Sequence, residues 1–238
     1  MPDPTLPKLT LHHVSSARAI SQDQIFDDLP TTMIFDQPIT VRAQPKTDLW
    51  RKPPHTDVDN APTVLIPSPI DIHKFQSARV TVSASWNTLY DQGGLILFVL
   101  DGDTTTWMKT GIEFFGGKPY VGSVATSEWS DWALVPLKKE KGGKVTVQVE
   151  RLVKGGEKME SLWVYTVDEE TGKKVAARQI TWWFKHDILD QENSKVGDNR
   201  RLLIGVYAAR PTVPAGEGRE QEELVVNLEG FQVNLFDD

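Results

Sequence analysis

Apolar and polar residues alternate over much of the chain with the two-residue period of β-strands. In residues 144–151, three valines occupy every second position, with Thr146, Gln148 and Glu150 between them. Residues 231–235 repeat the pattern. Because successive side chains of a strand point to opposite faces, such runs predict strands with one buried and one solvated face.

From about residue 79 onward these runs recur at a spacing of roughly 8–12 residues and are separated by turns. Turns such as "KGGK" and "EETGK" contain glycine, which adopts the positive φ that tight hairpins need. No segment keeps an apolar period of 3.6 residues over three turns, and the best helix candidate is 15–29. The sequence predicts an all-β fold with strands at 79–86, 94–100, 107–115, 120–126, 144–151, 161–167, 178–184, 201–208 and 223–236.

The chain of 238 residues shows no internal linker rich in Ser, Gly or Pro, so we expect one domain over residues 25–238. Residues 1–24 are expected to form an N-terminal arm or edge segment. Residues 51–63 combine prolines with polar residues and predict a long surface loop.

The run 107–115 has two unlike faces. One set of alternate residues is largely apolar, whereas the other carries Trp107, Lys109 and Glu113. An indole beside an ammonium and a carboxylate is not typical of a sandwich core. We therefore expect this second set to face a ligand rather than the core.

The pair Trp182 and Trp183 falls in another predicted strand, where neighbouring side chains must separate. By parity, Trp182 joins Ile180 and Phe184 in the core, and Trp183 joins Lys185 on the opposite face. The sequence thus predicts that Trp183 contacts a ligand and that Trp182 is buried.

Aromatic and arginine side chains supply the remaining candidates, because flat rings stack on sugars or other ring systems and guanidinium groups suit oxygen ligands. Each has a structural alternative: core packing for the tryptophans, a tight turn for "YDQGG", and an extended surface position for the arginines. Trp129 and Trp132 flank a turn, and either role stays open for them. The candidate ligand-binding residues are Trp50, Arg51, Tyr90, Gln92, Trp107, Lys109, Glu113, Trp129, Trp132, Trp183, Lys185, Tyr207 and Arg210.

Composition excludes several classes of function. The formal charge of −7 and the pI near 5.3 oppose the binding of nucleic acid, and the basic residues are scattered. The chain has no cysteine, so disulfides and thiolate chemistry are excluded. It has no apolar run long enough to span a membrane, and its N-terminus does not resemble a signal peptide. We expect a cytoplasmic protein with no membrane contact.

The sequence contains no clear motif for a metal site or for acid–base catalysis. The five histidines are dispersed, and "DGDTTT" lacks the later ligands of a calcium loop, so no metal site and no cofactor are predicted. Glu113 has no second acid two residues away on its strand, and this argues against a glycoside hydrolase that uses paired carboxylates.

The chain contains the segments "TDLWRKP", "LYDQGGLILF", "WMKTGIEFFGGKPYVGSVAT", "WSDWALVP", "LWVY", "TWWF" and "GVYAARPT". Together they resemble a fungal family of unknown biochemistry that is named for regulation of enolase. The resemblance covers about residues 35–236 and implies a concanavalin A-like antiparallel sandwich, in jelly-roll order, with a concave face that relatives of the fold use for sugars. The sequence differs from that pattern in its N-terminal extension and in residues 186–200, both of which are expected to cover or line the concave face.

Fold resemblance does not fix an activity, because function resides in the site. The first hypothesis is a ligand-binding module that holds a carbohydrate or small metabolite on a face lined by Trp and Arg, with a regulatory role in metabolism. The alternative is a biosynthetic enzyme, a cyclase or cycloaddition catalyst, that acts on an apolar molecule by positioning it. A protein-interaction scaffold is the third reading, with a protein partner or a homodimer left open.

Overall fold

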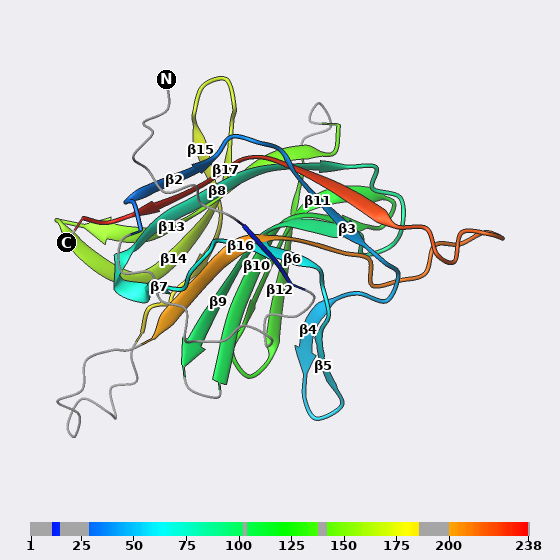
Figure 1. The fold of residues 1–238 in the computed structure, drawn as a ribbon, viewed down its shortest axis with the longest axis horizontal. Helices are drawn as coiled ribbons and strands as arrows, with labels where there is room; N and C mark the ends of the chain where they lie inside the picture. The colour runs from blue at the N-terminus through cyan, green and yellow to red at the C-terminus, as the bar shows by residue number, and fades with distance from the viewer. Residues whose placement is uncertain (1–10, 15–28, 102–103, 138–141, 186–199, 238) are drawn as a thin grey trace.

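A computed structural model describes residues 11–14, 29–101, 104–137, 142–185 and 200–237. Two antiparallel sheets stack face to face, and a separate two-stranded sheet lies beside them (Figure 1). The predicted fold class, an all-β antiparallel sandwich, is confirmed. Within the described residues, the only helix is the three-residue 3-10 turn η2 (Ile72–Lys74), and no helix is long and apolar enough to cross a membrane.

Sheet A has eight strands. The short strand β7 (Ile70–Asp71) pairs with β16 beside the main path. The order along the main path is β1 (His12–Val14), β6 (Thr63–Leu65), β16 (Arg201–Ala209), β9 (Gln92–Asp101), β10 (Thr104–Phe115), β11 (Lys118–Thr126) and β12 (Ser130–Pro136).

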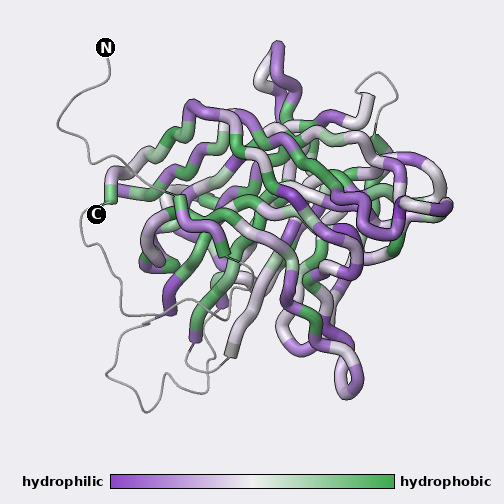
Figure 2. The backbone as a smooth tube through the Cα atoms, turned by 45° about the vertical axis from the view of Figure 1, so that its right-hand side comes forward, coloured by the Kyte–Doolittle hydropathy of each residue, from purple (hydrophilic) through white to green (hydrophobic). Residues whose placement is uncertain are grey.

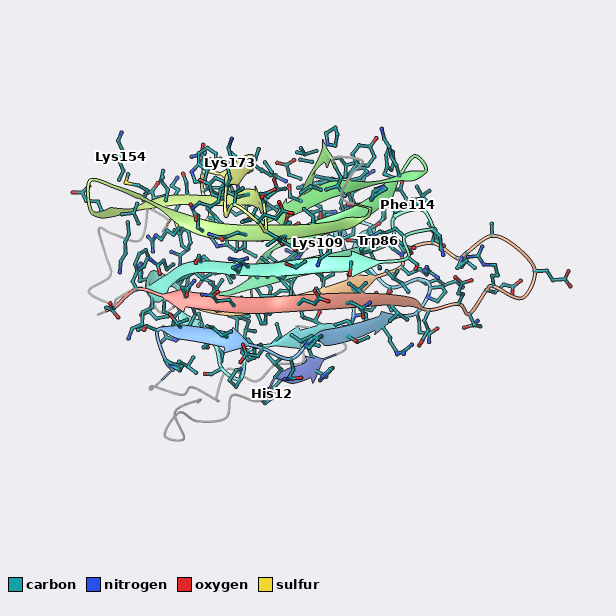
Figure 3. The ribbon with its side chains drawn as sticks, turned by 90° about the horizontal axis from the view of Figure 1, so that it is seen from above. His12, Trp86, Lys109, Phe114, Lys154 and Lys173 are labelled. Carbon is teal, nitrogen blue, oxygen red and sulfur yellow. The ribbon has the colours of Figure 1, made fainter. Side chains whose placement is uncertain are left out.

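Sheet B has seven strands, and β3 (Ile39–Ala43) pairs with β17 beside the main path. Figure 3 shows its long strands side by side, from β14 and β13 through β8 to the red strand β17. The order is β15 (Lys174–Ile180), β14 (Glu157–Val167), β13 (Lys144–Lys154), β8 (Phe75–Ala84), β17 (Leu224–Leu235) and β2 (Thr32–Phe35).

The hairpin turns follow from glycine. Gly116 and Gly117 join β10 to β11 with φ of 57° and 80°, the pair of positive angles that a two-residue hairpin turn requires. Because the turn contains two residues, it fixes the register in which Phe115 lies opposite Lys118 and Glu113 lies opposite Tyr120. This register determines which side chains of β10 and β11 become neighbours in the candidate site.

The main core lies between the sheets and is formed by one face of each. Val145, Val147 and Val149 of β13 are all buried there, as their alternation predicted. Apolar and polar residues alternate along many strands in Figure 2, which matches a sandwich with one core face and one outer face per sheet. Burial of this core is the main stabilising contribution to the fold.

The prediction for the two adjacent tryptophans was wrong. Strand β15 ends at Ile180, and the next four residues form a turn, so strand parity does not apply to them. Trp183 is 2% exposed in the main core, whereas Trp182 is 37% exposed. The turn therefore reverses the predicted burial of the two indoles, and Trp183 packs in the main core.

Other parts of the chain were predicted only coarsely. The expected surface loop 51–63 contains a hairpin of β4 (Leu49–Lys52) and β5 (Thr56–Asp59). Part of the expected N-terminal arm, β1, pairs with β6 at the edge of sheet A. The helix expected at 15–29 and the cover expected at 186–200 fall almost entirely outside the described residues.

Candidate functional site

The face of sheet A that points away from sheet B carries a second hydrophobic cluster, separate from the main core. We call it the outer face. Trp107 is 3% exposed in this cluster, and Tyr207 is also 3% exposed. The parity of β10 thus correctly separated Trp107, Lys109 and Glu113 from the core-facing set. The cluster consists of Leu49, Ala61, Leu65, Ile96, Phe98, Trp107, Val124, Leu203, Tyr207 and Ala209.

A segment of the β4 hairpin crosses the outer face and covers part of it. We call residues 47–52 the strap. Leu49 is buried in the outer-face cluster, and the backbone N–H of Arg51 donates to Ser130 Oγ at 2.9 Å. The Arg51 guanidinium donates to the carbonyls of Thr105 and Ser127 at 3.0 and 2.7 Å. Arg51 therefore ties the strap to sheet A, and these bonds occupy donors that a ligand would need.

Lys109 is buried beneath the strap. Its Nζ donates to Asp48 Oδ1 at 3.1 Å and to the Leu49 carbonyl at 2.7 Å. The ammonium also lies 5.8 Å from the ring centroid of Trp107 and 5.9 Å from that of Tyr207, within the range of cation–π attraction. These contacts supply partners for the ammonium of a lysine that is only 2% exposed.

Gln92 links the strap to β16. Its Oε1 accepts a 3.2 Å hydrogen bond from Tyr207 Oη, and its Nε2 donates to Asp48 Oδ1 at 3.4 Å. Burial raises the pKa of Tyr207 well above its ordinary value, and the negative charges of Glu113 and Asp48 act in the same direction. Tyr207 is therefore a neutral hydrogen-bond donor at physiological pH.

Glu113 is the carboxylate that the outer face leaves incompletely paired. It is 7% exposed, and its Oε2 accepts a 2.9 Å hydrogen bond from Trp132 Nε1. Its other oxygen, Oε1, accepts no hydrogen bond from the described residues and keeps contact with solvent. Burial raises the pKa of Glu113; Lys109 and the Trp132 bond offset part of this effect, and Asp48 adds to it.

Gly122 gives Glu113 the space it occupies. A Cβ atom placed on Gly122 would lie 2.9 Å from both Glu113 Cβ and Glu113 Oε2, closer than real contacts allow. The missing side chain on β11 lets the Glu113 side chain lie across that strand and reach Trp132 on β12. Gly122 is thus a positioning residue for the carboxylate.

Five half-buried rings form a connected network that reaches this carboxylate through Trp132: Trp50, Tyr90, Phe115, Tyr120 and Trp132. We call them the aromatic patch. The ring of Trp132 meets those of Trp50, Tyr90 and Phe115 edge to face, with centroids 6.4, 6.2 and 5.5 Å apart. Tyr90 stacks on Phe115 at 5.9 Å. Rings packed in this way hold one another rigidly and keep part of their apolar surface toward solvent.

Tyr90 is held in place by a buried ion pair. Its backbone has a φ of 65°, a left-handed conformation that is rare outside glycine. The next residue, Asp91, accepts from Arg210 Nε at 2.8 Å and from Nη2 at 2.9 Å, and the two side chains are 0% and 1% exposed. Asp91 also accepts from the backbone N–H of Thr88 at 3.0 Å. This arrangement fixes the turn that presents the Tyr90 ring to the aromatic patch.

The predicted role of Arg210 in ligand contact is therefore corrected. Its guanidinium is buried against Asp91 and also donates to the carbonyl of Glu222 at 2.7 Å. These N–H donors are therefore already bonded to oxygen atoms of the protein. Arg210 acts on the site only through the turn that carries Tyr90.

The structure brings eight of the thirteen predicted residues together on the outer face. Trp129 is 55% exposed in the turn between β11 and β12 and makes no ring contact with the aromatic patch within the described residues. Trp183 and Lys185 belong to the turn after β15 in sheet B, and Arg51 ties the strap. The residues brought together are Trp50, Tyr90, Gln92, Trp107, Lys109, Glu113, Trp132 and Tyr207.

Four residues of the site were not among the sequence predictions: Asp48, Phe115, Tyr120 and Gly122. Phe115 has the same parity as Glu113, and Tyr120 lies opposite Glu113 in the register that the two-glycine turn sets, so strand pairing identifies both. Asp48 lies 61 positions before Lys109, and nothing in the local pattern links them. The role of Gly122 can be recognised only in the folded structure, where Glu113 occupies the space that a side chain at position 122 would need.

The site offers a small set of chemical groups. It has one incompletely paired carboxylate, several ring faces, and cations that are already bonded to protein oxygens. No group of His, Asp and Glu that is suited to a metal ion occurs among the described residues. Such a surface suits a ligand that combines ring stacking with hydrogen-bond donors.

The fold and site together define an antiparallel β-sandwich protein with a polar and aromatic outer face. A family model described as a protein of unknown function (DUF1349) matches residues 30–235, and the chain belongs to this family. The resemblance to the regulation-of-enolase family is thereby confirmed.

Three known proteins illustrate the similarity. An uncharacterized protein of Emericella nidulans is 37% identical over 215 residues, which is 90% of this chain and 94% of that protein. The regulation of enolase protein 1 of Saccharomyces cerevisiae is 32% identical over 95 residues, covering 40% of this chain and 45% of that protein. A solved structure of a functionally unknown protein from Saccharomyces cerevisiae matches with a TM-score of 0.59 and 20% identity, over 87% of this chain and 93% of that one. The last comparison shows the shared fold alone.

Proposed function

We propose that this protein is a small-molecule-binding module that holds a carbohydrate-like ligand at the aromatic patch, with Glu113 accepting hydrogen bonds from it. The observation that carries the proposal is Glu113 itself. A carboxylate that is 7% exposed, with a raised pKa and one oxygen left without a bond among the described residues, costs the fold stability. A group kept at such a cost is typical of a functional site.

The surroundings of Glu113 favour a ring-shaped ligand rich in hydroxyl groups. Hydroxyls donate to a carboxylate, and the apolar faces of a sugar ring stack on aromatic side chains. Trp50, Phe115 and Tyr90 offer such faces beside Glu113, and all three are half-buried. The part of the outer face under the strap is filled by Lys109 and Tyr207, so the ligand is placed at the aromatic patch only.

The yeast relative gives this proposal a context. Its name refers to regulation of enolase, and 95 residues of this chain align with it. A protein that responds to a sugar-like ligand suits a regulatory role in carbohydrate metabolism, and we extend that role to this chain as part of the proposal.

The test is a thermal-shift and calorimetric screen with neutral mono- and oligosaccharides. At a ligand concentration one hundred times the Kd, binding stabilises the folded state by about 2.7 kcal/mol. That stabilisation raises the Tm of a chain of this size by roughly 5–11 °C. Trp50→Ala is expected to abolish the shift, and Trp129→Ala, an exposed tryptophan outside the aromatic patch, is expected to keep it. A wild type that no sugar stabilises, or a Trp50→Ala variant that responds like the wild type, would overturn the proposal.

A second candidate is the positioning enzyme, and the raised pKa of Glu113 favours it. Burial raises the pKa of Glu113 above its ordinary value, and a raised pKa makes a carboxyl group better suited to act as a general acid. In this case Glu113→Gln would retain ligand binding and lose turnover. If the protein is a binding module, Glu113→Gln would weaken ligand binding, and the wild type would form no product from the ligand.

A further inference from the structure

Three ionisable side chains meet on the outer face, and they comprise two acids and one base. Asp48 comes from the strap, and Lys109 and Glu113 lie two pleats apart on β10. The ammonium of Lys109 pairs with Asp48 at 3.1 Å and donates a hydrogen bond to the Leu49 carbonyl at 2.7 Å. These three side chains therefore comprise two acidic groups and one basic group, and the basic group is paired with Asp48 rather than with Glu113.

No neighbouring cation of the described structure pairs with Glu113. The guanidinium of Arg51 is bonded to backbone carbonyls and to Asp57, and that of Arg210 is bonded to Asp91. Lys118, at the exposed end of β11, places its ammonium 5.1 Å from the ring centroid of Tyr120 and is not ion-paired with Glu113. Glu113 has no ion-pair partner within 4.0 Å among the described residues.

This inference rests on the proposed function and specifies its ligand. We propose that the ligand carries an amine whose ammonium pairs with Glu113, so that an amino sugar, or another hydroxyl-bearing ring with an amine, is preferred over neutral and anionic sugars. The ammonium supplies the cation that the two acids and Lys109 lack. A hydrogen bond between an ammonium and a carboxylate is roughly twice as strong as a neutral one.

The same geometry disfavours anionic ligands. A sugar phosphate or a sugar acid at the aromatic patch would place its negative charge near Glu113 and Asp48. The cations that would bind it, Lys109 and Arg51, are already bonded to protein oxygens. The aromatic patch adds cation–π attraction for an ammonium and offers no matching attraction for an anion.

The experiment compares glucosamine with N-acetylglucosamine, glucose and glucuronate by calorimetry at neutral pH. N-acetylglucosamine carries its nitrogen as a neutral amide with an added acetyl group, and glucose replaces the amine by a hydroxyl without added bulk, so a preference for glucosamine over both isolates the ammonium. We expect glucosamine to bind about tenfold more tightly than its two neutral counterparts, and glucuronate to bind most weakly. Glu113→Gln should remove the preference, and Glu229→Gln, an exposed acid on sheet B, should retain it.

The outcomes separate the two proposals. If the neutral sugars bind as tightly as glucosamine and Trp50→Ala abolishes all binding, the binding function stands and the preference for an amine is wrong. If the preference for glucosamine persists in Glu113→Gln, Glu113 is not the partner of the ammonium and the inference is wrong. If no sugar of the panel binds the wild type, both proposals fail.

Discussion

The buried pair of Asp91 and Arg210 gives a test of how the site is supported. Arg210→Met removes the guanidinium while keeping a long side chain, and it leaves the Asp91 carboxylate, which is 0% exposed, without its two bonds of 2.8 and 2.9 Å. Removing one partner of a buried ion pair costs about 3–5 kcal/mol, because the other charge stays buried. For a chain of this length the expected fall in Tm is roughly 6–20 °C.

The assay is thermal unfolding followed by circular dichroism, with denaturant unfolding for the free energy. Arg42→Met is the control, because Arg42 is 61% exposed in its ion pair with Glu223, and such surface pairs contribute about 0–1 kcal/mol. Adding Asp91→Asn to Arg210→Met should recover part of the lost free energy of unfolding, because the second change removes the buried carboxylate charge that Arg210→Met leaves without its partner. If Arg210→Met lowers the Tm no more than Arg42→Met does, the structural role is refuted and Arg210 returns to the list of ligand contacts.

Three further predictions concern Glu113, its neighbour Gly122 and the adjacent tryptophans. Burial raises the folded-state pKa of Glu113 above the unfolded value, so Glu113 costs no stability at low pH and destabilises the fold as the pH rises through its folded pKa. Glu113→Gln should therefore unfold at higher denaturant than the wild type at pH 7, with the difference vanishing below about pH 4; an equal difference at both pH values would contradict this assignment. Gly122→Ala should displace the Glu113 carboxylate and weaken sugar binding in calorimetry, and unchanged affinity would mean that this carboxylate does not contact the ligand. Trp183→Ala should cost about 3–5 kcal/mol and Trp182→Ala about 1 kcal/mol in denaturant unfolding; the reverse order would support the strand assignment that the structure rejects.

The sequence pattern was most successful in the long regular strands, where it predicted which face of the strand is buried. The alternation in β10 and in β13 runs for several residues between glycine turns, so parity assigned their faces correctly. Parity failed at Trp182 and Trp183 because the strand ends at Ile180, and the local pattern contains no signal for that end.

The site required information that a local pattern does not contain. Asp48 and Lys109 are 61 positions apart, and Asp91 and Arg210 are 119 apart, so only the folded sandwich joins them. For both arginines, the sequence left open ligand contact and an extended surface position, and neither alternative foresaw bonds to the protein itself. In the fold, Arg51 ties the strap and Arg210 ties the turn that carries Tyr90.

The most direct test of the central claim is the NMR spectrum of the indole N–H groups of the eight tryptophans during titration with glucosamine and glucose. The N–H of Trp132 is bonded to Glu113, and the ring of Trp50 contacts that of Trp132, so both signals report on the aromatic patch. Their resonances, assigned with Trp132→Phe and Trp50→Phe, should shift in a saturable manner, while those of Trp163 on sheet B and Trp183 in the core stay in place. If the Trp132 and Trp50 signals do not move with either sugar, or if all eight move alike, the outer face is not the ligand site.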